Sequence, residues 1–360
     1  MRRVHSTCSW RPQRGARHRT LLAAAAIFAT AGLTPGASLA DEGGVSFWLP
    51  GLFGSLAAVP AQPGWQGETF FYNTNVRAGA DVATAREITI GRFNPTVNLG
   101  ASLRLSNDTP LQAFFPNYVF SSPVLGGQFS LGMLGFVGTP STTVSGTVTA
   151  AVPPFTFTRT DSITDSVTGN GDLYPMAILK WHQGVDNFMI YGAGDIPVGT
   201  YNSSSLANLG IGHGAVDAGM GYTYLDEKTG HEFSAVGGFT YNLINTHTNY
   251  QNGVDFHLDW GTSQYLNKQT FIGAVGYLYQ QVSADSGSGD RVGAFESRTV
   301  GVGPQIGYLF PVGDMQGYIN MKGYAEFEGL HRATGFNVWL TFAISPAAPM
   351  SMMKSMMSHK

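Results

Sequence analysis

Apolar and polar residues alternate one by one through several segments of this chain, and no other feature restricts the possible folds as strongly. Successive side chains of a β-strand point to opposite faces, whereas apolar residues of a helix recur about 3.6 positions apart. The segments with the two-residue period are 231–242, 253–261, 317–329 and 334–344. They are therefore predicted to be strands with one apolar and one polar face.

The composition is poor in charge and rich in aromatic residues and glycine, but the sequence offers no membrane-spanning helix in which to bury the apolar side chains. Only 12% of the residues are charged, 12% are aromatic and 47 are glycines. After residue 40 the chain contains no uninterrupted run of about 18 apolar residues, which a spanning helix needs. A bilayer can also be crossed by a closed barrel, in which every backbone group is paired between strands. The sequence therefore predicts an all-β fold, a transmembrane antiparallel up-and-down β-barrel over residues 67–346.

Turn-forming residues divide this region into fourteen predicted strands. Short turns should alternate with longer loops, as in outer-membrane barrels, where both termini lie on the periplasmic, short-turn side. The Thr-rich part at 139–168 leaves room for one hairpin more or fewer, so twelve strands are the alternative. The predicted strands are 67–77, 95–105, 110–121, 127–137, 141–151, 171–182, 187–196, 213–225, 231–243, 253–265, 270–282, 293–309, 317–328 and 335–344. The predicted short turns are Ser106–Thr109, Gly138–Pro140, Gln183–Asp186, Asp226–Gly230, Leu266–Gln269 and Pro311–Gln316.

The first forty residues have the features of a secretory signal peptide that is removed. Six arginines and no acid precede the apolar run 21–31, and small residues at 38–40 suit cleavage. The only cysteine, Cys8, lies in this part, so no thiol or disulfide is expected in the mature chain. Every acidic residue follows residue 40, so the mature chain is acidic and nucleic acid is not an expected partner.

Two further segments flank the predicted barrel. Residues 41–66 are apolar but broken by Pro50, Gly51, Gly54 and Pro60. Their aromatic residues Trp48 and Phe53 suit either a plug inside the barrel mouth or an anchor at the membrane interface. Residues 347–360 form a Met-rich tail, which is expected to be disordered.

A cluster of charged residues at 226–232 resembles a metal site but lacks its full pattern. His231 and Glu232 begin like the zinc-protease motif H-E-x-x-H, but position 235 is alanine and the segment alternates as a strand. Asp226–Gly230 is instead predicted to be a tight turn in which Gly230 supplies the positive φ. No catalytic residue, metal site or cofactor is expected in the chain.

Several long segments closely resemble the outer-membrane family named for the meta-cleavage pathway of phenol degradation. Its members are described as transporters or channels for aromatic compounds. The resemblance therefore implies a place in the outer membrane of a Gram-negative bacterium and a role in aromatic uptake. The segments that carry it are 43–65, 208–266, 276–289, 301–310 and 322–346.

Charged and titratable residues on the predicted lumen faces, together with one tyrosine, are the candidate functional residues, because charges within a membrane span are usually functional or paired. They would line the solute pathway, although the aspartates and the histidine could also bind a cation or simply line a wet lumen. The lumen-facing candidates are Asp255, His257, Asp259, Arg298, Lys322, Tyr324 and Glu326.

The predicted function is a channel, not an enzyme, that passively admits small hydrophobic or aromatic solutes and contacts outer-membrane lipid. Lumen polarity and constriction would set its selectivity. One alternative is a lipid-acting barrel hydrolase, which requires a Ser/His or Asp/His pair at the lipid-facing rim. Another is a non-conducting structural or adhesive barrel with a filled lumen. The oligomeric state stays open.

Overall fold

The structure is a computed structural model that describes residues 46–79, 101–152, 155–290 and 296–347. Within these ranges the regular secondary structure is β-strand, and no helix is long and apolar enough to cross a membrane. The predicted signal peptide with Cys8, the tail from residue 348 onward and positions 95–100 of one predicted strand lie outside the described residues.

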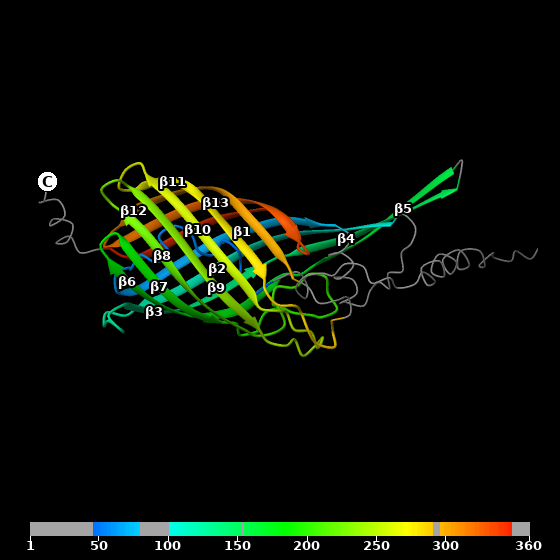
Figure 1. The fold of residues 1–360 in the computed structure, drawn as a ribbon, viewed down its shortest axis with the longest axis horizontal. Coiled ribbons are helices and arrows are strands. Elements are labelled where there is room, and N and C mark those ends of the chain that lie inside the picture. Colours follow the sequence, from blue (N-terminus) through cyan, green and yellow to red (C-terminus); the bar gives the residue numbers. More distant parts are fainter. Residues whose placement is uncertain (1–45, 80–100, 153–154, 291–295, 348–360) are drawn as a thin grey trace, which may run out of the picture.

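Fourteen antiparallel strands form one sheet, and twelve of them close a barrel (Figure 1). Closure occurs at β1, which pairs with β14 along one edge and with β2 along the other. The strands are β1 (Gly64–Ala78), β2 (Ala101–Val119), β3 (Gln128–Gly138), β4 (Ser141–Val152), β5 (Phe155–Ser166), β6 (Gly169–Gln183), β7 (Asp186–Gly194), β8 (Ala215–Asp226), β9 (His231–Asn242), β10 (Asp255–Tyr265), β11 (Thr270–Gln281), β12 (Arg298–Val312), β13 (Met315–Leu330) and β14 (Thr334–Pro346). The prediction of an all-β antiparallel barrel is confirmed.

The two strands outside the barrel are β4 and β5, which form a hairpin that projects from one end (Figure 1). The hairpin continues the sheet from the first half of β2, where Ala101–Asp108 pair with β4. The second half of β2 pairs instead with β3, which β6 follows in the barrel wall. The Thr-rich region thus supplies one hairpin, and the barrel itself has the twelve strands of the alternative prediction.

The predicted turn at Ser106–Thr109 is wrong, because these residues lie in the middle of β2. Asn, Asp and Thr favour turns when the chain is considered locally. Here strands on both sides pair with them: Asp108 faces Asn75 of β1 and Ser141 of β4. The two predicted strands 95–105 and 110–121 therefore merge in β2, while the unpredicted β5 restores the total to fourteen.

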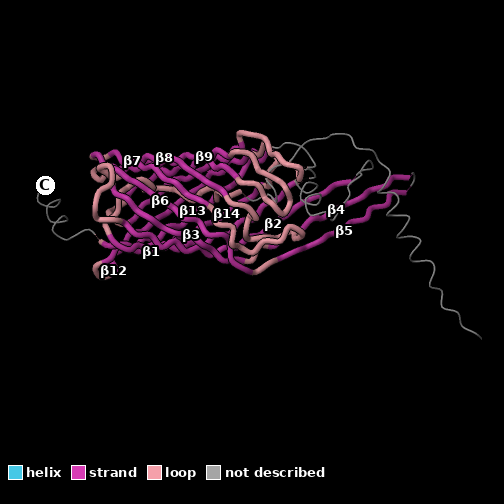
Figure 2. The backbone as a smooth tube through the Cα atoms, turned by 90° about the horizontal axis from the view of Figure 1, so that it is seen from below, coloured by secondary structure: helices cyan, strands magenta, loops and turns pink. Residues whose placement is uncertain are grey.

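The short connections gather at one end of the barrel, and the hairpin projects from the opposite end (Figure 2). The short-turn end holds the links β6–β7, β8–β9, β10–β11 and β12–β13, together with Gly64 of β1 and Pro346 of β14. The long-loop end holds residues 195–214, 243–254, 282–290 and 296–297. The predicted turn at Gly138–Pro140 also lies there, because it joins β3 to β4.

The strands bury polar side chains inside the barrel and expose apolar side chains outside it. On β14, Phe336 is 55% exposed while the neighbouring Asn337 is 2% exposed. On β9, Phe239 is 55% exposed and Thr240 is fully buried. The alternation in the sequence therefore separates the two faces of the wall, as it does in transmembrane barrels.

Candidate functional site: the barrel lumen

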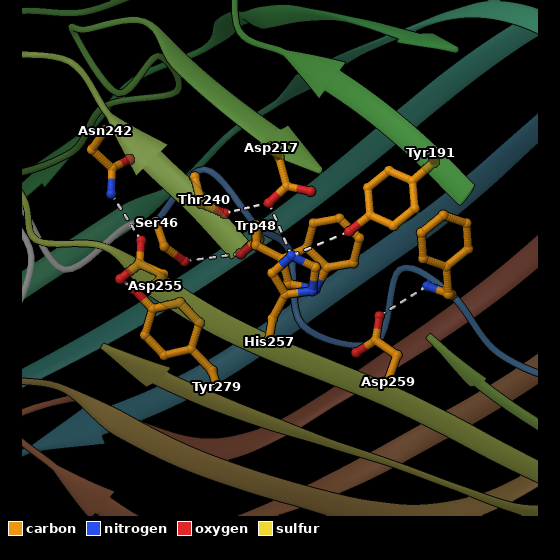
Figure 3. Close-up of polar contacts among 11 residues, drawn as sticks. Ser46, Trp48, Tyr191, Asp217, Thr240, Asn242, Asp255, His257, Asp259 and Tyr279 are labelled. Carbon is orange, nitrogen blue, oxygen red and sulfur yellow. Dashed lines mark hydrogen bonds and ion pairs between the residues drawn. The ribbon is translucent and has the colours of Figure 1, made fainter. Parts of the chain in front are cut away.

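Residues 46–63, called the lumen segment below, run through the inside of the barrel along its length. Near the long-loop end, Arg332 Nη2 donates to the Ser46 hydroxyl at 3.3 Å. Near the short-turn end, the amide of Ala61 donates to Gln128 at 2.8 Å. Figure 3 shows the lumen segment crossing the inward-facing side chains at the level of Trp48. The lumen segment thus contacts the inner wall of the barrel. Its effect on permeability stays a prediction.

Asp259 of β10 and Lys322 of β13 hold the backbone of the lumen segment from two sides. The Asp259 carboxylate accepts the amides of Gly51 and Phe53 at 2.9 and 3.1 Å. The Lys322 ammonium donates to the carbonyl oxygens of the same two residues at 2.6 and 3.4 Å. Hydrogen bonds to charged groups contribute about 1.5–3 kcal/mol each. Two residues of the segment therefore satisfy both buried charges.

His257 of β10 carries the main ring contact of the lumen segment. Its imidazole stacks on the Trp48 indole, with ring centroids 3.7 Å apart and planes 12° apart. Its Nε2 lies 2.9 Å from Asp217 Oδ2 on β8 and 3.3 Å from the Tyr191 hydroxyl on β7. Figure 3 shows these residues converging from three strands under the Trp48 ring. Because a carboxylate only accepts, Nε2 carries the proton donated to Asp217.

The part of the lumen segment nearer the short turns is held by neutral side chains and by two charged residues, Glu232 and Lys180. The Leu56 amide donates to Glu232 and to the Ser234 hydroxyl, both at 3.0 Å. The Ala58 amide donates to Thr223 Oγ1 at 3.0 Å, and Lys180 Nζ donates to the Val59 carbonyl at 3.2 Å. Glu232 is 2% exposed, so it belongs to the lumen wall and not to the exposed turn that precedes it.

Asp255, the third candidate on β10, is satisfied by the wall. Asn242 Nδ2 and the Tyr279 hydroxyl donate to its carboxylate at 2.8 and 2.7 Å. Figure 3 shows the Asn242 amide directed at the Asp255 carboxylate. The carboxylate therefore helps to tie β9, β10 and β11 together.

The other two candidates on β13 face the same lumen. Tyr324 is buried with its ring against Gly51. Glu326 accepts a hydrogen bond from the Tyr277 hydroxyl at 2.6 Å and one from the Gly335 amide at 3.0 Å. Together with Lys322, they form an inward row that meets the lumen segment beside Gly51.

Arg298 lies apart from the other candidates. It begins β12 and pairs with Glu328 at 3.7 Å, where both side chains are substantially exposed. An exposed pair of this kind contributes at most about 1 kcal/mol. The structure does not bring Arg298 together with the lumen charges, and its role in a solute pathway stays a prediction.

Sequence reasoning missed Asp217 and Tyr191, which complete the surroundings of His257. Asp217 carried a usable signal, because an acid within a predicted strand between apolar neighbours must face inward. Tyr191 carried none, since tyrosine occurs on either face of a barrel strand. Only the closure of the barrel brings β7, β8 and β10 around one ring.

The described residues place an Asp/His pair inside the lumen, not at a lipid-facing rim. In this part of the chain the hydrogen-bond partners of His257 are Asp217 and Tyr191, and no serine hydroxyl is among them. No group of three or more His, Cys, Asp or Glu residues is arranged to hold a metal ion within the described ranges. The predicted turn Asp226–Gly230 is present, with Gly230 at φ +73°.

Comparisons with known proteins identify a family and a fold. The family model described as "Putative MetA-pathway of phenol degradation" matches residues 92–342. The COG4313 outer membrane channel from Pseudomonas putida F1 is similar in structure, with a TM-score of 0.56 and 12% sequence identity. That likeness covers 80% of this chain and 97% of the channel. Comparison with curated proteins gives no match.

Another solved structure resembles the chain more distantly. A FadL homologue from Pseudomonas aeruginosa aligns over 86% of this chain and 98% of its own, with a TM-score of 0.36 and 9% identity. The likeness to the COG4313 channel shows the fold alone, which is that of an outer-membrane barrel.

Proposed function

Because the chain belongs to the family described as the MetA pathway of phenol degradation, we propose that it is an outer-membrane channel for small hydrophobic or aromatic compounds. Solutes would cross by passive diffusion, without covalent chemistry. The lumen segment would act as a plug that limits passage in the resting protein. The short-turn end would face the periplasm and the long-loop end the cell exterior, which is the usual orientation of such barrels.

The observation that carries the proposal is the way in which the lumen segment is held. Its attachments are hydrogen bonds and ring contacts to inward side chains such as Asp259, His257 and Lys322. All of them are noncovalent, so the segment can leave without breaking the wall. The wall left behind would combine polar groups with aromatic rings such as Tyr191 and Tyr324, a mixture that suits small aromatic molecules.

The first experiment compares flux through the protein reconstituted in liposomes. Phenol should enter faster than a sugar of similar size, after correction for its passage through lipid alone. Changing Asp255, His257 and Asp259 to alanine should alter the protein-dependent phenol flux. A folded protein that admits neither solute faster than protein-free liposomes would contradict the proposal.

The second experiment removes the predicted plug. Deletion of residues 43–62 should raise the leak of small solutes through a barrel whose wall strands are all retained. An unchanged leak would mean that these residues do not limit passage.

A non-conducting structural barrel is the second candidate, favoured by the presence of the lumen segment inside the barrel. It predicts no solute flux through the intact protein, even with a steep aromatic gradient. Flux measurements on the intact protein and on the deletion variant therefore separate the two functions. A hydrolase is a weaker candidate, since the Asp217–His257 pair faces the lumen under Trp48.

A further inference from the structure

Trp48 and the side chains beneath it have the arrangement of a ligand bound in a site. The indole is 2% exposed and lies flat on the His257 ring. Tyr191 flanks it with centroids 6.1 Å apart, and Phe53 of the lumen segment lies 5.6 Å away. Contacts between aromatic rings contribute about 0.5–1.5 kcal/mol beyond the burial of area. Two of these three neighbouring rings belong to the wall, and one belongs to the lumen segment itself.

The polar atoms around the ring show which chemistry the site leaves unsatisfied. Asp217 Oδ1 and His257 Nδ1 are buried and have no hydrogen-bond partner among the described residues. Asp217 Oδ1 is an acceptor, and His257 Nδ1 is an acceptor in the neutral imidazole whose proton lies on Nε2 and is donated to Asp217. The Trp48 Nε1 donor is also buried without a partner in the same ranges. The indole therefore fills the site by shape but satisfies neither acceptor, and buried unpaired polar groups are costly.

We propose that His257, Tyr191 and Asp217 form a binding site for planar aromatic molecules that carry an O–H or N–H donor. Trp48 is its built-in occupant in the plugged state, and an aromatic solute competes with it. The inference deepens the proposed function and rests on it for its physiological role. The Asp217 carboxylate would repel an aromatic carboxylate, so the site should prefer phenol or indole to benzoate.

The position of Trp48 makes such competition useful for gating. Trp48 lies toward the long-loop end, because Ser46 two residues earlier contacts Arg332 of the β13–β14 link. A solute entering from that end would meet the Trp48 site before it reaches the contacts of Asp259 and Lys322 with Gly51. Displacement of the ring would loosen the first part of the lumen segment and leave the second part attached.

The test uses indole, the side chain of Trp48 itself, as the probe. The full protein with Trp48→Ala should bind one indole in titration calorimetry, with a Kd that is roughly millimolar for a ligand of this size. The unmodified protein should bind indole at least about tenfold more weakly, because Trp48 fills the site. Trp65→Ala is the matched control, since Trp65 is 67% exposed on β1. It removes a tryptophan without opening the lumen and should behave like the unmodified protein.

Further measurements define the site and its selectivity. Adding His257→Ala to Trp48→Ala should weaken indole binding at least about tenfold, because one stacking face is lost. Phenol should compete with indole in the Trp48→Ala protein, and benzoate at the same concentration should not. A folded Trp48→Ala protein that binds indole no better than Trp65→Ala would overturn the proposal. If Trp48→Ala does not fold, Trp48→Leu is judged by the same criterion.

The test of the Trp48 site and the test of the channel can give different results. Indole binding to Trp48→Ala, combined with no protein-dependent flux in the unmodified barrel, would keep the site and reject the channel. Protein-dependent phenol flux without indole binding to the folded variant would keep the channel and reject the site.

Discussion

The two halves of the lumen segment are held in the barrel by different chemistry. Residues 46–54 are fixed by Asp259, Lys322 and the stacked rings of His257 and Trp48. Residues 55–63 are fixed largely by hydroxyl and amide groups such as Thr223 and Gln128, with Glu232 and Lys180 as their charged contacts. Charged contacts in a buried site are each stronger but leave a larger penalty when broken. The first half should therefore depend on a few residues, and the second on the sum of many.

The largest effect is expected from Asp259→Ala. The change removes two charge-assisted hydrogen bonds and takes away one of the two buried carboxylates, Asp259 and Glu68, whose charge acts on Lys322. At about 1.5–3 kcal/mol for each hydrogen bond to a charged group, the two lost bonds correspond to about 3–6 kcal/mol. Hydrogen exchange at the amides of Gly51 and Phe53 should show this loss in the free energy of local opening. Hydrogen exchange within β10 should stay unchanged. If the exchange rates of the Gly51 and Phe53 amides also stay unchanged, Asp259 is not the main attachment of the lumen segment.

A double substitution tests whether Asp259 and Lys322 act as a unit. Asp259→Ala with Lys322→Met removes both buried charges, so the second change should cost less than it does in the unmodified protein. Residues that share partners usually couple by about 0.5–3 kcal/mol, and we expect about 2 kcal/mol here. The opening free energies of the four proteins in the cycle give the coupling. Simple additivity would mean that each charge binds the segment independently.

A matched pair of glycine substitutions examines the fit of the first half. Gly51 has φ +88°, and an added Cβ would lie 3.0 Å from the Tyr324 ring. The Gly51→Ala change should therefore loosen residues 46–54 by about 1–3 kcal/mol. An added Cβ at Gly54 meets only Lys322 Nζ, at 3.4 Å. Gly54→Ala should shift hydrogen exchange in this region much less, and equal effects would contradict the packing of Gly51 against Tyr324.

The smallest effect is expected from Thr223→Val in the second half. The change keeps the shape but removes the acceptor of the Ala58 amide. A neutral hydrogen bond contributes about 0.5–1.5 kcal/mol, and neighbouring contacts at Leu56 and Ala61 remain. Exchange at Ala58 should accelerate while Gly51 stays protected. Loss of protection at both positions would show that the two halves open together.

Strands with strict alternation were predictable because successive side chains of an extended chain point to opposite faces, whatever the strand pairs with. Asp255, His257 and Asp259 share a face in any extended chain, whatever it pairs with. The Ser106–Thr109 segment failed for the opposite reason: its residues favour a turn locally, and only pairing with β1 and β4 makes it extended. The strand at Phe155–Ser166 was missed because Arg159, Asp161 and Asp165 interrupt the alternation of apolar residues.

The sequence by itself determined that the protein is an all-β antiparallel barrel with polar residues inside, because a period of two is a local property. It also marked Trp48 and Phe53 as part of a segment too broken to span a membrane. Tertiary structure alone decided that twelve strands close the barrel and that Asp217, Tyr191 and His257 meet beneath Trp48. These contacts join residues far apart in the chain, so they depend on strand register and barrel closure, which no local pattern encodes.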